Sequence, residues 1–182
     1  MRKYFALCLG VALITGVALA KTEYKYALKM IKPGESSENI FADESIKIRF
    51  VIDRSMFAFG MDNRTNEPIT VDWDKISYLD AFGRSHRLMH SGVRFIQRKE
   101  QQAPTTIPPR ASFSSRLIPT DQIYIEPGAT GGWKVHDLFP KPEQGSKVIG
   151  KTVSILMPLR IKGEVKDYNF VFAIDLVATE VK

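Results

Sequence analysis

Two histidines in the segment GRSHRLMHSG, residues 83–92, have side chains suited to binding a metal ion. His86 and His90 are four positions apart, a spacing that a helix would bring together on one face. On a β-strand, which rises about 3.3 Å per residue, their Cα atoms lie roughly 13 Å apart, too far for both to hold one zinc ion at about 2.1 Å. Gly83 and Gly92 bracket the segment and disfavour a helix. We therefore expect a strand and no metal site.

The residues before Gly83 predict what these histidines contact. A three-residue turn over 81–83, with the glycine in the left-handed region, would pair residues 69–80 with 84–98. This register predicts that His86 packs beside Tyr78 and that His90 pairs with Asp74 on a solvated face. The same register sets two further pairs opposite each other, Asp80 with Arg84 and Ile76 with Leu88. A role for the imidazoles in pH sensing or ligand contact is the alternative.

Asp72 and Asp74 are the residues that most resemble a catalytic carboxylate pair. Two positions apart on one strand, they would lie about 6.6 Å apart, close to the separation in glycosidases. Solvated strand faces commonly carry such pairs, and Trp73 between them points the other way, into the expected core. The sequence contains no G-x-S-x-G, H-E-x-x-H, Walker-type or C-x-x-C motif. We expect a protein that is not an enzyme and that needs no cofactor.

An uneven distribution of charge indicates where a partner would bind. Residues 84–116 carry seven basic side chains against Glu100 alone, whereas residues 62–80 carry five acidic side chains against two basic ones. In one interpretation the acidic and the basic segment are neighbouring strands whose charges neutralise each other. In the other, Arg94, Arg98, Lys99 and Arg110 stay uncovered and bind an acidic partner such as lipid head groups, an anionic glycan or an acidic protein.

Trp133 is the second candidate for partner binding. It follows Gly131-Gly132 in residues 126–146, a segment rich in glycine and proline that we interpret as a long loop. A tryptophan in a loop either stacks on a sugar or peptide or closes the open end of a β-sandwich.

Apolar and polar residues alternate with a period of two through most of the chain, which predicts strands. The clearest hairpin has alternating strands over 153–161 and 168–176 and a turn over 162–167. The proline-rich residues 103–112 indicate an extended linker along a sheet edge. Residues 62–68 read as a turn in which Asn63 of the sequon Asn-Arg-Thr caps the bend. No window has helical spacing. We expect one all-β domain over residues 21–182, an antiparallel β-sandwich with Ig-like or related topology, with a closed barrel as the alternative.

The first twenty residues have the organisation of a secretory signal peptide. Arg2 and Lys3 precede an apolar stretch that ends in Ala18-Leu19-Ala20, which predicts cleavage after Ala20 and no transmembrane anchor afterwards. Cys8, the only cysteine, does not match a lipoprotein signal.

The net charge of the chain after cleavage is small. Removing Arg2 and Lys3 from 26 basic residues leaves 24 against 20 acidic ones, a net charge of +4, too weak to indicate nucleic-acid binding. We expect a periplasmic or secreted bacterial protein.

The segment FAFGMDNRTNEPITVDWDKISYLDAFGRSHRLMHSG, with TTIPPRASF and LIPTDQI after it, resembles a loose group of uncharacterised exported bacterial proteins and lipoproteins. The resemblance covers residues 57–125 and implies a β-sandwich in the cell envelope, with no activity or catalytic residue attached. Many such proteins have a lipidated cysteine, and this chain has an ordinary cleavage signal instead.

These observations favour a non-catalytic envelope protein that binds or supports a partner, a protein or another envelope component of acidic character, in a surface assembly. Two other hypotheses stay open: a module that binds glycan or peptidoglycan through Trp133 and the basic segment, and an extracytoplasmic enzyme or enzyme inhibitor.

Overall fold

The computed structural model describes residues 22–129 and 131–180, so the expected signal peptide lies outside the described residues. The described residues form strands and short 3-10 helices, with no α-helix among them. The strands are β1 Thr22–Lys32, β2 Ile40–Ala42, β3 Ile46–Ile52, β4 Phe57–Asn63, β5 Ile69–Val71, β6 Ser77–Leu79, β7 Ser85–His90, β8 Thr105–Ile107, β9 Ser112–Pro119, β10 Ile123–Glu126, β11 Gly132–Val135, β12 Thr152–Ile161 and β13 Glu164–Glu180. The 3-10 helices are η1 Trp73–Lys75, η2 Phe95–Gln97, η3 Thr120–Gln122 and η4 Pro142–Lys147.

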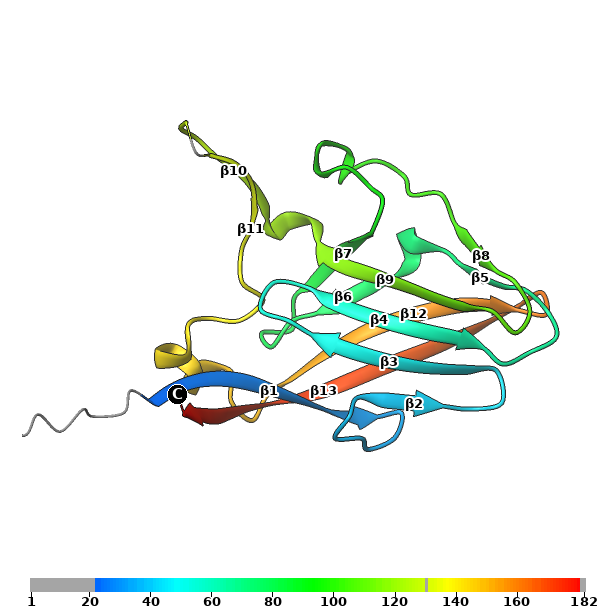
Figure 1. Cartoon of the computed structure of the whole chain (residues 1–182), viewed down its shortest axis with the longest axis horizontal. Coiled ribbons are helices and arrows are strands. Elements are labelled where there is room, and N and C mark those ends of the chain that lie inside the picture. Colours follow the sequence, from blue (N-terminus) through cyan, green and yellow to red (C-terminus); the bar gives the residue numbers. More distant parts are fainter. Residues whose placement is uncertain (1–21, 130, 181–182) are drawn as a thin grey trace, which may run out of the picture.

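The strands pair antiparallel in one continuous path, β1-β13-β12-β6-β7-β9-β4-β3-β2, with β5 and β8 attached beside β12. The path folds over at the β6–β7 hairpin, which gives one layer of β1, β13, β12, β5, β6 and β8 and another of β7, β9, β4, β3 and β2. Figure 1 shows β3, β4 and β9 in front of β12 and β13. The prediction of an antiparallel all-β fold is confirmed. Because the layers remain joined by β6–β7 pairing, the sandwich is close to a barrel.

The core lies between these two layers and follows from the period-two pattern. In β3, Ile46, Ile48 and Phe50 are buried, whereas the residues between them are exposed. Phe50 lies 4.9 Å from Phe170 and 5.3 Å from Phe172 of β13, between ring centroids. Because successive side chains of a strand point to opposite faces, one apolar face per layer is sufficient to form this core.

Asn39 joins the layers at their free margin, through its side chain on β1 and its backbone carbonyl on β3. Its amide nitrogen donates to the Leu28 carbonyl at 3.0 Å, and the Met30 N–H donates to its amide oxygen at 2.7 Å. The Phe50 N–H donates to the Asn39 carbonyl at 3.0 Å. One asparagine therefore satisfies the backbone of β1 on one side and β3 on the other, in place of a further strand.

Several predicted strands and turns differ from the structure. Residues 69–80 are not one strand: β5 and β6 are separated by η1, and Trp73 lies in that 3-10 helix, although it is buried as expected. The arm predicted over 84–98 ends at His90, because Gly92 turns the chain with φ of +97°. The prediction for 103–112 is confirmed in part, since β8 is a short strand that pairs only with β5.

The final hairpin turns more tightly than predicted. Its turn consists of Lys162 and Gly163, with φ of 53° and 83°, and not of residues 162–167. Two consecutive positive φ values match the twist of the flanking strands, as in type I′ turns. The prediction was wrong because residues 164–167, three of them charged, resemble a loop in composition, whereas in the structure they belong to the exposed start of β13.

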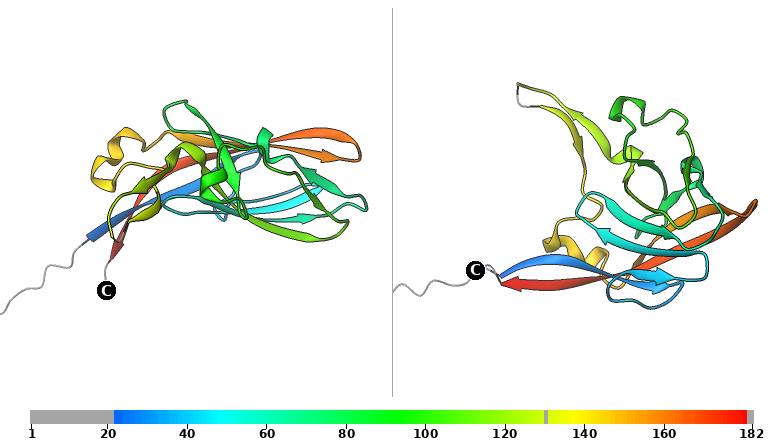
Figure 2. Two further views of the ribbon diagram at one scale, coloured as in Figure 1. Left: turned by 90° about the horizontal axis from the view of Figure 1, so that it is seen from above. Right: turned by 45° about the vertical axis from the view of Figure 1, so that its right-hand side comes forward.

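Two segments extend away from the sandwich at one end. One is the β10–β11 hairpin, which forms a separate two-stranded sheet, and the other is the loop over residues 91–101 that contains η2. Figure 2 shows both leaving the body of the molecule. The long loop expected over 126–146 was therefore wrong in part, because it contains β11, and Trp133 lies on that strand. Among the described residues, no helix is both long and apolar enough to cross a membrane.

Candidate partner-binding surface

Trp133 and Arg98 come from distant parts of the sequence and are in contact. The Arg98 guanidinium lies 5.0 Å from the centre of the Trp133 ring, a cation–π arrangement. Phe95 packs edge-on against the same ring with centroids 6.1 Å apart. The 91–101 loop and the β10–β11 hairpin are therefore packed against each other, and two of the sequence-predicted residues meet at their junction.

Large apolar side chains around this junction are exposed to solvent. Ile96 is 73% exposed, Ile125 62% and Trp133 37%, and Ile125 is the cross-strand partner of Trp133. We call these residues with Phe95 and Arg98 the Trp133 platform. Arg94 and Lys99 are exposed residues of the same loop, next to Phe95 and Arg98 in the sequence. Exposed apolar side chains gathered in one place and bordered by charge are typical of an interaction site.

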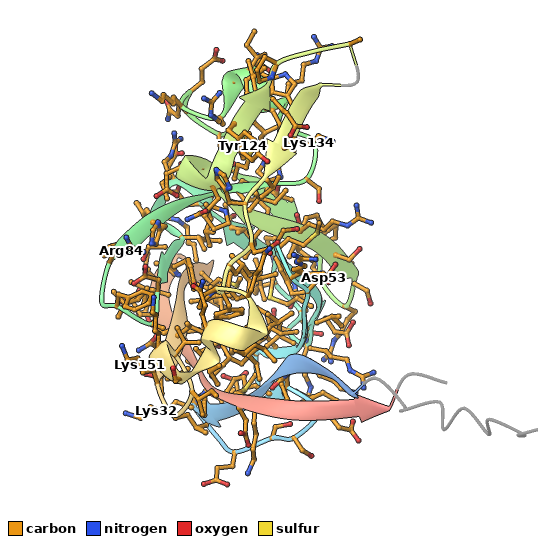
Figure 3. All side chains as sticks on the ribbon, turned by 90° about the vertical axis from the view of Figure 1, so that its left-hand side faces the viewer. Lys32, Asp53, Arg84, Tyr124, Lys134 and Lys151 are labelled. Carbon is orange, nitrogen blue, oxygen red and sulfur yellow. The ribbon has the colours of Figure 1, made fainter. Side chains whose placement is uncertain are left out.

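One face of the β10–β11 hairpin belongs to the Trp133 platform, and the other faces solvent. Ile123, Ile125, Trp133 and Val135 share the first face. On the second face, Tyr124 stacks on His136 at 4.1 Å and Lys134 pairs with Glu126 at 3.7 Å. Figure 3 shows Tyr124 and Lys134 at the end of the molecule opposite Lys32.

Gly131 is required by the tight end of this hairpin. A Cβ atom on it would lie 2.1 Å from the Glu126 carbonyl oxygen, so no other residue fits without moving the backbone. The next residue, Gly132, has φ of +134°, which also favours glycine. The two glycines that made residues 126–146 resemble a loop therefore build the turn that presents Trp133.

Arg87 holds the base of the 91–101 loop. Its guanidinium forms an ion pair with Asp74 at 2.5 Å and donates to the Arg98 carbonyl at 3.2 Å and to the Glu100 carbonyl. The pKa of Asp74 is lowered, because hydrogen bonds from Arg87 and Gln102 outweigh the burial that would raise it.

Gln102 fixes the other end of the loop. The side chain is buried, its amide nitrogen donates to the Leu88 carbonyl at 2.8 Å, and its oxygen accepts from the His90 N–H at 3.0 Å. Its backbone N–H donates to the Asp74 carboxylate. A buried amide that bonds the backbone of β7 in this way acts as a substitute strand partner. Sequence reasoning missed it, because one glutamine has no pattern that reveals its partners.

His86 and Asp121 hold the base of the hairpin. The buried imidazole lies 2.7 Å from Asp121, just before β10, and 3.2 Å from the buried carboxylate of Asp80. Each ring nitrogen faces a carboxylate, so only the imidazolium donates to both. The predicted neighbour is confirmed: His86 lies opposite Tyr78, with ring centroids 5.4 Å apart.

The prediction for His90 was wrong. Its ring stacks on Trp73 with centroids 4.2 Å apart, and Asp74 pairs with Arg87 instead. The reason is that η1 interrupts the predicted strand and changes the register beyond Ser77. Burial lowers the pKa of His90. Among the described residues, no group of three or more His, Cys, Asp or Glu side chains is arranged to hold a metal ion.

The remaining predicted residues are in different places. Arg110 is not part of the platform, because it follows β8 and its Nε donates to Asn66 at 3.0 Å. Asp72 pairs with Lys75 at 3.1 Å, so the two aspartates around Trp73 belong to separate ion pairs. Asn63 is buried and its oxygen accepts from the Thr65 N–H at 2.9 Å, which confirms it as a turn-capping residue.

Both interpretations of the charge distribution describe part of the structure. Asp80 pairs with Arg84 and Asp74 with Arg87, so the acidic and basic segments neutralise each other near the β6–β7 hairpin. Further along the basic segment, five cations make no ion pair with any residue in 22–129 or 131–180: Arg94, Arg98, Lys99, Arg110 and Arg116.

Comparisons with known proteins find similar structures only at low similarity. The sequence matches no protein-family model and no curated protein. A crystal structure of a protein from Archaeoglobus fulgidus is 16% identical, with 76% of this chain and 98% of that chain covered and a TM-score of 0.28. An X-ray structure of a Northeast Structural Genomics Consortium target is 10% identical, with 87% and 86% covered and a TM-score of 0.29. Neither name describes an activity.

Proposed function

We propose that the protein is a non-catalytic component of the bacterial cell envelope that binds an acidic protein through the Trp133 platform. The observation that supports this proposal is the contact between Trp133 and Arg98, surrounded by exposed isoleucines and unpaired cations. The signal peptide predicted from residues 1–20 gives the compartment: the periplasm or the cell exterior.

The chemistry of the platform is that of a protein interface. Tryptophan and arginine are the residues most enriched among those that dominate binding energy, and apolar neighbours exclude water around them. Arg98 and Phe95 already hold the Trp133 ring, so little side-chain freedom is lost when a partner binds. The exposed Arg94 and Lys99 would accelerate association with an acidic surface and make it sensitive to salt.

A glycan-binding module is the second candidate, and the exposed Trp133 ring favours it. A sugar ring stacks on an aromatic face, however, and the Arg98 guanidinium lies over one face of Trp133. The exposed Ile96 and Ile125 add apolar area without hydroxyl or carboxylate groups that would bind sugar hydroxyls. The platform therefore suits a protein better than a glycan.

Site-specific photo-crosslinking in the native envelope tests the proposal. A photoreactive phenylalanine analogue at Ile96 or Ile125 should yield an adduct with one acidic protein, and the same analogue at Val165, 53% exposed on β13, should not. Raising the salt concentration should reduce the adduct. Equal adducts at all three positions, or adducts with lipid or glycan alone, would contradict an acidic protein partner.

The contribution of the platform is then measured with the captured protein. Arg98→Glu or Trp133→Ala should weaken binding by about 2 kcal/mol, roughly 30-fold, as for a central interface residue. Arg110→Glu is the matched control, because Arg110 is on the basic segment and outside the platform. An effect of Arg110→Glu equal to that of Arg98→Glu would show that net charge, and not the platform, determines binding.

A further inference from the structure

Gly60 occupies a position in β4 where the fold does not require glycine. It lies in the middle of the strand, φ is outside the left-handed region, and a Cβ atom would meet nothing within 4 Å. Pairing continues without a bulge from Arg49 through Gly60 to Ser114. Glycine inside a strand weakens it, and in the absence of a bulge or bend it marks a place where a ligand approaches the backbone closely.

A shallow groove lies over this glycine on the outer face of β3, β4 and β9. Gly60 and Ala58 form the floor, because they are the outward residues of the central strand and have almost no side chain. The hollow has a volume of about 430 Å³, within the range of small-ligand sites. Its walls are Arg49 and Val51 from β3 on one side and Ser114 and Arg116 from β9 on the other, with Ser91 beside them.

The groove is positively charged. Arg116 makes no ion pair with any described residue, and its backbone N–H donates to Ser91 at 2.9 Å. Arg49 lies 3.6 Å from Glu38, but both side chains are more than 60% exposed, so this pair is weak and exchanges easily. The Arg49 and Arg116 Cα atoms are two strands and two residues apart, roughly 12 Å. A sugar ring fits within this separation.

We propose that this groove binds a short anionic saccharide, with its ring over Gly60, its carboxylate or phosphate group on Arg116 and Arg49 on the opposite side of the ring. Arginine binds carboxylate and phosphate through paired N–H donors. The Ser114 hydroxyl, which is exposed at the wall, is a partner for sugar hydroxyls. The site is separate from the Trp133 platform and its occupancy does not depend on the function proposed for that platform.

The backbone amide of Gly60 reports occupancy directly in amide NMR spectra of the purified protein. Trigalacturonic acid and glucose 6-phosphate distinguish a carboxylate from a phosphate, inorganic phosphate tests the anion alone, and maltotriose tests the neutral sugar. We expect at least one anionic saccharide to shift Gly60 and its neighbours in a saturable way, and maltotriose to leave them unchanged. No shift by either anionic saccharide would overturn the proposal, as would binding of inorganic phosphate with equal affinity.

Two substitutions test whether the groove is the site. Gly60→Val fills the floor without a clash and introduces a good strand former, so the thermal midpoint should stay the same or rise while binding falls by at least about 10-fold. Arg116→Gln should weaken binding similarly, and Arg160→Gln, an exposed arginine on β12, is the charge-matched control. Full binding by both Gly60→Val and Arg116→Gln would overturn the site. Should Gly60→Val fail to fold, Arg116→Gln against Arg160→Gln decides.

Discussion

The carboxylate of Asp80 stabilises the β6–β7 turn and is almost fully buried. It accepts hydrogen bonds from the Phe82 and Arg84 N–H groups at 2.8 and 2.9 Å and pairs with the Arg84 guanidinium at 2.7 Å. Burial by itself would raise the pKa of Asp80, but hydrogen bonds from Arg84, Phe82 and His86 outweigh it and hold the pKa at about 2. Its folded pKa therefore lies below the ordinary 3.8 of an unfolded aspartate.

A depressed pKa means that Asp80 stabilises the fold above the unfolded pKa and that this contribution is lost as pH falls through about 2. Asp80→Asn should lower the free energy of unfolding at pH 7 by about 2 kcal/mol and should flatten its decline below pH 4. Urea unfolding at pH 7 and pH 3 measures both effects. Asp167→Asn, an exposed carboxylate on β13, is the control and should change neither value by more than about 0.5 kcal/mol. A variant with unchanged acid sensitivity would contradict this role of Asp80.

We expect opposite effects on stability from removing the hydroxyl groups of two buried tyrosines. The Tyr78 hydroxyl is buried without a hydrogen-bond partner among the described residues, and burial raises its pKa. The Tyr168 hydroxyl donates to the Asp43 carboxylate at 2.9 Å. Tyr78→Phe should be neutral or stabilising by up to about 1 kcal/mol, whereas Tyr168→Phe should destabilise by about 1.5 kcal/mol. Thermal unfolding of the two variants measures the difference. Equal destabilisation by both would show that the Tyr78 hydroxyl has a partner.

At the scale of elements, Asn39 closes the margin between β1 and β3. Its side chain bonds Leu28 and Met30, and its φ of 57° is a conformation that asparagine and glycine tolerate best. Asn39→Gly should cost about 1–2 kcal/mol, because it keeps the backbone conformation and loses both hydrogen bonds. Asn39→Ala should cost about 1 kcal/mol more, because it adds left-handed strain.

Hydrogen exchange locates the effect of these variants. The amide of Met30 should lose protection in both, whereas amides of the β12–β13 hairpin should keep theirs. Equal stability of Asn39→Gly and the unmodified protein would show that the edge of β1 does not need the side-chain bridge.

The two projecting elements owe their position to contacts at their bases. The 91–101 loop is held by Arg87 and Gln102, and the β10–β11 hairpin by Asp121 on His86. The sandwich thus supplies the rigid part, and the platform forms where the two projections meet. Substituting a base residue would therefore move the platform without removing any of its side chains.

At the scale of the whole molecule, export is the testable expectation. Expression of the full chain in a bacterium should give a processed protein in the periplasm or medium, with Lys21 as its first residue. N-terminal sequencing and intact mass measure this directly. Replacing Ala18 and Ala20 with bulky residues should leave an unprocessed precursor, and Ala27→Leu, beyond the cleavage site, should not affect processing. Unprocessed protein in the cytoplasm would contradict the envelope location.

Much of the sandwich is predictable from the period of two. Ile46, Ile48 and Phe50 alternate with charged residues, and a strand puts alternate side chains on opposite faces whatever surrounds it. The β6–β7 turn was predictable for a related reason: Gly83, with φ of +80°, fits the left-handed position, and short-range geometry sets the pairing of Asp80 with Arg84. These features depend only on neighbours in the chain.

Contacts between distant segments follow no such local rule. Trp133 and Arg98 were each candidates, but nothing in their spacing placed one over the other or separated both from Arg110. The partner of Asp74 changed from His90 to Arg87 because a single turn of 3-10 helix shifted the register. Composition and periodicity indicate which face of its own strand a side chain points to. Which surfaces then meet depends on how the β6–β7 hairpin folds the sheet over, and that is a property of the packed core as a whole.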